Sequence, residues 1–318
     1  MRSFKNRDFL TLMDYSKDEV LGIIDLADEL KEKRAKREPH AYLQGQTIAM
    51  IFEKHSTRTR LSFQAGAAHL GLQAFYMDPS TMQISRGESL MDTAKTIDRY
   101  ADALVIRTHE QAIVDDFAKY MDRPVINALT NESHPCQLLA DIQHVREKKG
   151  RLKDLKIGYV GDVWNMAHSW GIVSSMFGWE MMYALPKSYE HLFWPRAKEF
   201  IEKTNKETGG SFIMTQNHKD AMSDADVVVG ITFVSMTRGA TEDDMKKKLA
   251  DFMPYQINSE AMSWAKDDAI FMHCLPAHRG EEVTDEVIDG PQSFVFDQAE
   301  NRMHTEKALL ALLLGGVE

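Results

Sequence analysis

The 318-residue sequence contains only two cysteines, Cys136 and Cys274. Two cysteines form no disulfide framework and indicate a reducing, cytoplasmic setting. No apolar run reaches the roughly 18 residues of a membrane span, and the N-terminus lacks an apolar signal core, so we expect neither a transmembrane helix nor a signal peptide. Basic residues are fewer than acidic ones, 38 against 48, which gives a net charge of −10. This balance argues against nucleic acid or an anionic membrane as the main partner.

Several motifs of common enzyme classes are also missing. The stretch Gly158–Asp162 lacks the G-x-G-x-x-G spacing of a dinucleotide site, and Trp164 would crowd a pyrophosphate. The chain has no P-loop, no Ser-His-Asp order and no histidine or cysteine cluster with the spacing of metal ligands. We therefore expect no cofactor and no bound metal.

What the sequence does contain is a regular alternation of short apolar runs and helical segments. This alternation predicts an α/β fold with two domains, each a mostly parallel sheet flanked by helices. A charged, glycine-containing break at Lys148–Arg151 places the domain boundary between residues 149 and 150. Strands are predicted at 48–52, 71–77, 103–106, 124–127, 156–160, 179–184, 211–214, 226–231, 269–273 and 294–296, and a final helix from about residue 300 to 314.

The sequence Ser-Thr-Arg-Thr-Arg at residues 56–60 stands between the first buried strand and the following helix. Ser56 is the predicted N-cap of that helix. Free N–H groups at a helix start favour an anion, and Arg58 can add a bidentate pair to phosphate oxygens. A capped surface helix with solvated arginines would have the same local sequence, so other parts of the chain must decide.

Further polar residues stand where other predicted strands end. They are Arg107, His134, Gln137 and the run His273-Cys274-Leu275-Pro276, and Arg302 is expected to open the final helix. In open α/β sheets ligands bind at this carboxyl edge. The set is rich in cationic and hydrogen-bond donors and has no catalytic carboxylate pair. It suits a phosphate-bearing substrate and a reaction in which negative charge develops.

Four motifs in order along nearly the whole chain resemble the aspartate/ornithine carbamoyltransferase family, and the last three resemble its ornithine branch. The motifs are Ser-Thr-Arg-Thr-Arg, His-Pro-Cys-Gln, His-Cys-Leu-Pro-Ala-His-Arg-Gly and Asp-Gln-Ala-Glu-Asn-Arg. The resemblance implies transfer of the carbamoyl group of carbamoyl phosphate to an amine, as in the conversion of ornithine to citrulline in arginine metabolism. It implies a carbamoyl phosphate-binding domain at 1–149 joined by a helix at 300–318, a second-substrate domain at 150–299, and a homotrimer.

The resemblance also implies roles for individual residues. A phosphate cradle would be formed by Ser56, Thr57, Arg58 and Thr59. Arg107 would bridge phosphate and carbamoyl oxygen, His134 and Gln137 would contact the carbamoyl group, and Arg302 would add a further phosphate-side arginine. Cys274 and Leu275 would hold the carbamoyl amide end beside the attacking amine, and Gln83 would reach a neighbouring subunit's site. Arg107, His134 and Cys274 are the predicted catalytic residues. His134 could instead cap a helix, and Cys274 could be inert packing.

The second-substrate half departs from the ornithine pattern. Asn165, Ser235 and Met236 match residues that contact the amino-acid end of ornithine. At the position of the expected aspartate stands Ile231, with the bulky Trp164 and Phe233 nearby. An ammonium group facing Ile231 would lack a counter-charge, at a cost of several kcal/mol. The acceptor is therefore either an amine without a free α-ammonium, or ornithine held by another acid such as Glu242 or Asp243.

Two other classes remain as alternatives. The chain could be a catalytically silent relative that binds carbamoyl phosphate or assembles with another subunit. It could also be a nucleotide-dependent transferase, although it lacks a P-loop and a Mg²⁺-binding constellation.

Overall fold

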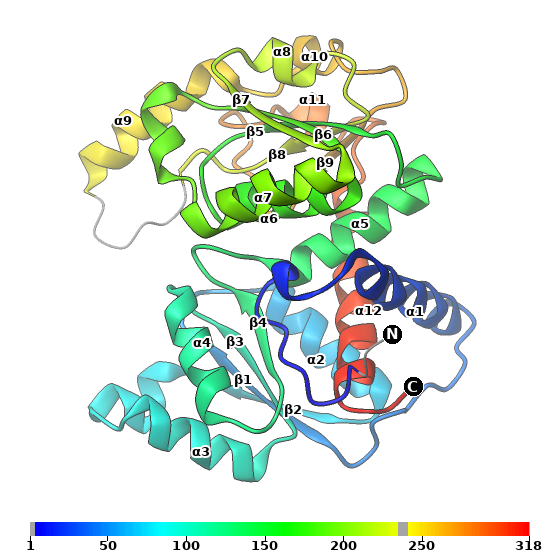
Figure 1. The fold of residues 1–318 in the computed structure, drawn as a ribbon, viewed down its shortest axis with the longest axis vertical. Coiled ribbons are helices and arrows are strands. Elements are labelled where there is room, and N and C mark those ends of the chain that lie inside the picture. The colour runs from blue at the N-terminus through cyan, green and yellow to red at the C-terminus, as the bar shows by residue number, and fades with distance from the viewer. Residues whose placement is uncertain (1–3, 235–240, 318) are drawn as a thin grey trace. The chain divides into compact units, whose positions relative to one another are not determined.

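The computed structural model describes residues 4–234 and 241–317, and the chain forms two compact units. Unit 1 combines residues 1–143 with residues 299–318, and unit 2 spans residues 144–298. The chain passes between the units inside two helices, α5 (Pro135–Lys149) and α12 (Val295–Leu313). Each unit is a parallel sheet flanked by helices, which confirms the predicted α/β class (Figure 1).

Unit 1 is built on a four-stranded parallel sheet whose strand order is β2-β1-β3-β4. Its elements are β1 (Thr47–Phe52), β2 (Gln73–Met77), β3 (Ala103–Arg107), β4 (Val125–Leu129), α1 (Lys17–Ala35), α2 (Arg58–Leu70), α3 (Leu90–Tyr100) and α4 (Gln111–Tyr120). Helices α3 and α4 cover one face of the sheet, and α2 and α12 cover the other (Figure 1). Gly66 allows α2 to approach α12, because a Cβ there would lie 3.1 Å from Lys307 Cγ.

Unit 2 is built on a five-stranded parallel sheet whose strand order is β7-β6-β5-β8-β9. Its elements are β5 (Lys156–Val160), β6 (Glu180–Ala184), β7 (Ser211–Thr215), β8 (Val227–Gly230), β9 (Ile270–His273), α6 (Asn165–Phe177), α7 (Pro195–Thr208), α8 (His218–Met222), α9 (Glu242–Phe252), α10 (Ser259–Met262) and α11 (Asp285–Ile288). Within the described part of the chain, no helix is long and apolar enough to cross a membrane.

Both sheets reverse their strand order once, between β1 and β3 in unit 1 and between β5 and β8 in unit 2. At such a switch point the two connections leave the sheet in opposite directions and open a crevice beyond the strand ends. In unit 1 the residues beyond β1 include Ser56–Arg60, and β3 ends at Arg107. In unit 2 the residues beyond β5 and β8 begin with Gly161 and Ile231. The strand order therefore brings predicted site residues to the switch point of each sheet.

The prediction of a strand at residues 294–296 is wrong. Only one residue, Ser293, forms a bridge with Phe271 of β9, and Val295 already begins α12. The Val295 side chain is buried while Phe296 is 68% exposed, as on a half-buried helix. A run of three apolar residues does not distinguish a strand from the start of a helix. Helices α8 and α9 were also not predicted, although α9 begins with a capping box formed by Thr241 and Asp244, which is a sequence signal for the start of a helix.

Helix α8 packs against the sheet of unit 2 at Gly158 of β5. A Cβ at Gly158 would lie 2.6 Å from the carbonyl oxygen of Ala221 and 3.2 Å from Cα of Met222. Both are backbone atoms, so the helix cannot yield by turning a side chain. The close packing of α8 on the sheet therefore depends on a residue without a side chain.

We expect Gly158→Ala to lower the free energy of unfolding by roughly 1–3 kcal/mol, because overpacking forces a backbone shift. Chemical denaturation of the full chain measures the loss. Gly230→Ala on the adjacent strand β8 is the control, since its Cβ would meet the side-chain atoms Ile257 Cδ1 and Phe271 Cε2 at 3.1 and 3.2 Å. An equal or larger loss for Gly230→Ala would show that the backbone contact is not the limiting one.

Candidate active site

The predicted site residues divide between the two units, and each group is described by itself. Unit 1 holds the larger group, which comprises Ser56, Thr57, Arg58, Thr59, Gln83, Arg107, His134, Gln137 and Arg302. Unit 2 holds Asn165, Ile231, Cys274 and Leu275. Ser235 and Met236 lie outside the described residues.

The corner after β1 has a different cap from the one predicted. The N-cap of α2 is Thr57, not Ser56, and its side chain makes no capping hydrogen bond. Thr57 has helical dihedral angles, φ −83° and ψ −54°, whereas an N-cap residue usually has extended ones. The first turn of α2 thus begins without a side-chain cap, and the N–H groups of such a turn favour an anion.

Arg60 is separated from the rest of this corner. Its guanidinium lies 3.7 Å from the ring centroid of Tyr76 in a cation–π contact, and the side chain is exposed. Arg58 is half-buried, and Thr59 is buried. We therefore use the name anion corner for Ser56–Thr59.

Arg302 joins residues that lie far apart in the sequence. Its Nη1 donates to Oε1 of Gln137 at 2.8 Å, and its Nη2 donates to Oγ1 of Thr59 at 3.2 Å. The side chain is only 2% exposed. The prediction that Arg302 opens the last helix is wrong, because α12 begins at Val295 and Arg302 lies two turns further on. This position inside the helix lets Arg302 reach both α2 and α5.

His134 lies in a strongly cationic environment. It is 5% exposed, and burial lowers its pKa well below the usual value, with further lowering from Arg302, Arg107 and Lys54. The imidazole is therefore neutral at physiological pH and keeps one N–H donor. A neutral donor among cations is suited to an oxygen on which negative charge develops. Arg107, the last residue of β3, is paired in register with Phe52 of β1.

Lys54 was not among the predicted site residues. Its Nζ donates to Oδ1 of Asn131 at 2.5 Å. Burial, and to a smaller extent the charge of Arg107, lowers the pKa of Lys54 to about 8. The position of Lys54, between a buried strand and the Ser-Thr-Arg-Thr-Arg motif, was the sequence signal that could have marked it as a candidate site residue. Gln83, in contrast, is exposed on the 3₁₀ turn Gln83–Arg86.

In unit 2 the residues after β9 form a tight turn. Leu275 has a positive φ of 56°, and its N–H donates to Nδ1 of His273 at 2.9 Å. On the other side of the ring, His273 Nε2 lies 3.2 Å from Oε1 of Glu282, and both side chains are fully buried. The ring that holds Leu275 therefore has a buried acid beside it, Glu282, which was not a predicted site residue. Cys274 is half-buried beside it.

The switch point of unit 2 is apolar where the family pattern led us to expect an aspartate. Ile231 is 6% exposed, and its Cγ2 would lie 2.3 Å from a Cβ at Gly161. Gly161 has a φ of +135°, so only glycine fits there comfortably. Next to it the buried Asp162 is already paired with Nζ of Lys248 at 2.6 Å. Asn165 is half-buried at the first position of α6.

One group of side chains in the described ranges has atoms close enough to share a metal ion. His278 Nδ1 lies 3.9 Å from Glu281 Oε2 and 3.8 Å from Glu282 Oε2. His278 Nδ1 also lies 2.9 Å from the hydroxyl of Thr232.

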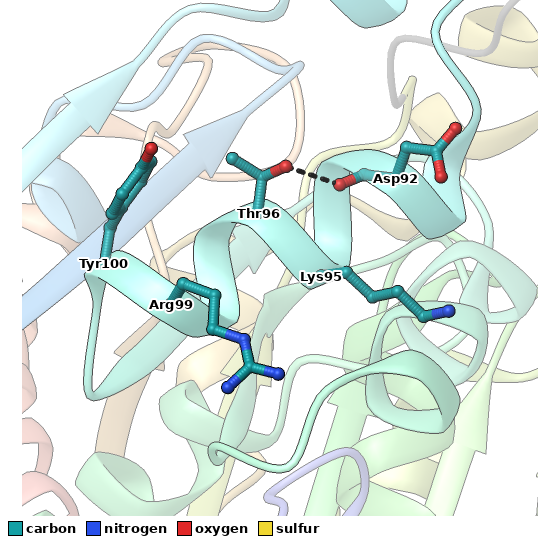
Figure 2. A pocket seen from close by; sticks show the side chains of 5 residues that line it. All are labelled: Asp92, Lys95, Thr96, Arg99 and Tyr100. Carbon is teal, nitrogen blue, oxygen red and sulfur yellow. Dashed lines mark hydrogen bonds between the residues drawn. The ribbon is translucent and has the colours of Figure 1, made fainter.

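A separate shallow hollow on α3 is lined by Asp92, Lys95, Thr96, Arg99 and Tyr100, none of which is a predicted site residue (Figure 2).

Comparison with known proteins identifies the family. Residues 7–147 match the model "Aspartate/ornithine carbamoyltransferase, carbamoyl-P binding domain", and residues 153–313 match the model of its "Asp/Orn binding domain". Because the two models cover most of the chain, it belongs to the aspartate/ornithine carbamoyltransferase family.

Within this family the chain falls in the ornithine branch. It is 46% identical over 318 residues to an ornithine carbamoyltransferase of Pyrococcus abyssi, an alignment that covers 99% of this chain and 98% of the relative. An ornithine carbamoyltransferase of Bacillus subtilis is 46% identical over 312 residues, covering 98% and 95%. The solved structure of the Pyrococcus furiosus enzyme superposes with a TM-score of 0.93 at 44% identity, with full coverage of both chains.

We expect Arg58→Gln to weaken the binding of inorganic phosphate by roughly 10- to 100-fold, because a hydrogen bond to a charged group contributes about 1.5–3 kcal/mol. Isothermal titration measures the affinity. Arg60→Gln, the same change two residues further along α2, should alter it by less than about threefold, since a surface cation contributes little. Equal effects of the two variants would contradict a localised anion corner.

Proposed function

We propose that the chain transfers the carbamoyl group of carbamoyl phosphate to the side-chain amine of ornithine, producing citrulline and phosphate. The supporting observation is the 46% identity to a protein named ornithine carbamoyltransferase over essentially the whole chain. Unit 1 would bind carbamoyl phosphate, and unit 2 would bind the amine. The matches to a carbamoyl-P binding model and an Asp/Orn binding model support this division.

The phosphate group of the substrate would bind at the anion corner. The N–H groups of the first turn of α2 and the guanidinium of Arg58 are its donors in this proposal. Arg302 would stabilise the same charge from the side of Thr59, to which it is already hydrogen-bonded. Phosphate would leave into this cradle, where its charge is compensated.

The carbamoyl group would be polarised by Arg107, His134 and Gln137. A neutral amine attacks the carbamoyl carbon, and the carbonyl oxygen becomes an oxyanion as the tetrahedral intermediate forms. When the intermediate collapses, the C–O bond to phosphate breaks, and the proton lost by the amine passes to the departing phosphate. The neutral imidazole of His134 and the cation of Arg107 would stabilise this oxyanion. The loss of one well-placed donor of this kind typically costs about 10²–10³ in rate. Binding both substrates together would supply much of the remaining acceleration.

On the amine side we propose that Cys274 and Leu275 border the attacking nitrogen and that Asn165 contacts the amino-acid end of the acceptor. The turn that holds Leu275 through His273 would set the position of both residues. Ser235 and Met236 are assigned to the same pocket from the sequence motif alone. We also propose a cytoplasmic homotrimer in which Gln83, on its exposed turn, reaches the site of a neighbouring subunit.

The purified chain, given carbamoyl phosphate and L-ornithine without ATP, should form citrulline and phosphate in equal amounts. Colorimetric detection of citrulline and of phosphate checks this. Activity that required ATP would contradict the proposal. Binding of carbamoyl phosphate without phosphate release for any amine in a panel would favour the silent relative.

Ile231 favours a second candidate, a carbamoyltransferase for an amine without a free α-ammonium. An ammonium beside Ile231 would face a methyl group where a carboxylate is expected, and the nearby Asp162 is already paired with Lys248. Burial of an unpaired charge costs several kcal/mol. The acids considered as substitutes, Glu242 and Asp243, are exposed at the start of α9.

If this second candidate holds, Ile231→Asp should raise kcat/KM for L-ornithine about 10-fold or more over the unmodified chain, because it restores a counter-charge. The same change should lower kcat/KM for ornithine acylated at its α-amine. Ile231→Asn is the control of similar shape without charge, and it should not produce the gain. Efficient use of L-ornithine by the unmodified chain, with a loss in both variants, would exclude the second candidate.

A further inference from the structure

Glu306 is a buried acid directly connected to the predicted anion site of unit 1. It lies one turn after Arg302 on α12 and is only 1% exposed. Its Oε1 accepts hydrogen bonds from Nε of Arg302 at 3.0 Å and from Nη2 at 2.6 Å. None of the proposed steps of carbamoyl transfer uses this carboxyl group.

The bonds of Arg302 lead from Glu306 to the anion corner. A guanidinium has five N–H donors. Two of those on Arg302 bond to Glu306, one on Nη1 bonds to Gln137, and one on Nη2 bonds to Thr59 of the anion corner. The charge on Glu306 therefore determines how much of the positive charge of Arg302 is already neutralised before an anion binds.

Glu306 changes its charge in the physiological pH range. Burial raises the pKa of its carboxyl group to about 7, and this outweighs the lowering by Arg302 and by the Ser62 hydroxyl. Arg302 itself remains charged at every pH of interest, because burial, which lowers the pKa of its guanidinium, is outweighed by the nearby charge of Glu306, which raises it. Near neutral pH the pair therefore alternates between a net charge of zero and a net charge of +1.

The other titratable groups around this pair differ in their behaviour. On the α5 side, burial raises the pKa of the Cys136 thiol and lowers that of His134, so both are neutral near pH 7. Asp141 accepts a hydrogen bond from Nε2 of Gln137 at 2.8 Å. Helix α2 contributes the uncharged Thr59 and Ser62. Three cations lie further out. Arg107 and Lys54 act on His134, and Lys307 follows Glu306 in the sequence. Burial lowers the pKa of each of the two lysines to about 8.

We propose that Glu306 is a positioning residue that takes up a proton from solvent when a dianion binds at the anion corner. The positive charge of Arg302 is then compensated by the bound anion in place of the Glu306 carboxylate. This rests on the proposed function, which makes the corner an anion site. By linkage, a bound dianion favours the protonated acid, and a protonated acid favours the dianion to the same extent. Anion affinity then rises as the pH falls through the neutral range.

Sulfate is the suitable probe, because it stays dianionic over the whole range, whereas phosphate itself titrates near neutral pH. Calorimetric titration at pH 7.5, in buffers of different ionisation enthalpy, counts the protons taken up. We expect about half a proton or more per sulfate, and an affinity about threefold or more higher at pH 6 than at pH 7.5.

The variants separate Glu306 from the rest of the site. Glu306→Gln keeps the shape and an acceptor for Arg302 but cannot take up a proton, so uptake should fall to about 0.2 protons or fewer, the remainder belonging to Lys54 and Lys307. Glu300→Gln makes the same chemical change at an exposed position on α12 and should behave like the unmodified chain. In parallel, KM for carbamoyl phosphate in Glu306→Gln should lose its dependence on pH between 6 and 7.5.

Unchanged proton uptake in Glu306→Gln would overturn the proposal. If that variant does not fold, the carboxyl resonance of Glu306 in the unmodified chain, followed by ¹³C NMR with and without sulfate, replaces it. A pKa that fails to rise by about one unit on saturation also overturns the proposal. Citrulline formation by the same preparation keeps the two questions apart. Activity without coupled proton uptake rejects only the role of Glu306, whereas absence of both activity and anion binding rejects the proposed function.

Discussion

The site of unit 1 depends on the burial of one cation, the guanidinium of Arg302. A buried charge is costly unless its donors are paired, and the partners come from three helices: Glu306 on α12, Gln137 on α5 and Thr59 on α2. The positions of these helices and the pairing of the charge are therefore coupled. Because the donors are already oriented, an anion bound at the proposed corner would need little rearrangement of the protein, which is the condition for effective electrostatic stabilisation.

Each of the two sheets reverses its strand order once, but the residues at the switch point are cationic in unit 1 and apolar in unit 2. In unit 1 the strand ends lead to cations and hydrogen-bond donors around His134. In unit 2 Ile231 packs on Gly161, and Asp162, the next residue after Gly161, is held by Lys248. In the proposed function the phosphate of the carbamoyl donor would be bound by residues of the first core, and the amino-acid end of the acceptor by residues of the second.

The sequence was sufficient for those features that depend on periodicity and motif order. Apolar runs such as Ile48–Phe52 identified the parallel strands, and Arg107 does lie at the end of β3 as predicted. Features that depend on local backbone geometry or on packing were not predictable: Thr57 rather than Ser56 immediately precedes α2, and the run Phe294–Phe296 leads into a helix. Glu306 and Lys54 were missed because their significance arises from burial beside Arg302 and Arg107, which one sequence does not reveal.

The chain order of unit 1 has a consequence for synthesis. Arg302 follows the whole of unit 2 in the sequence, whereas its partners Thr59 and Gln137 precede unit 2. Domains generally begin to fold from the N-terminal side while the chain is being made. The ribosome must therefore translate all of unit 2 before Arg302 is present to pair with the hydroxyl of Thr59 and the amide of Gln137. The nascent first segment consequently has no complete anion site, and a chain terminated before α12 would carry the Ser-Thr-Arg-Thr-Arg motif without the arginine that supports it.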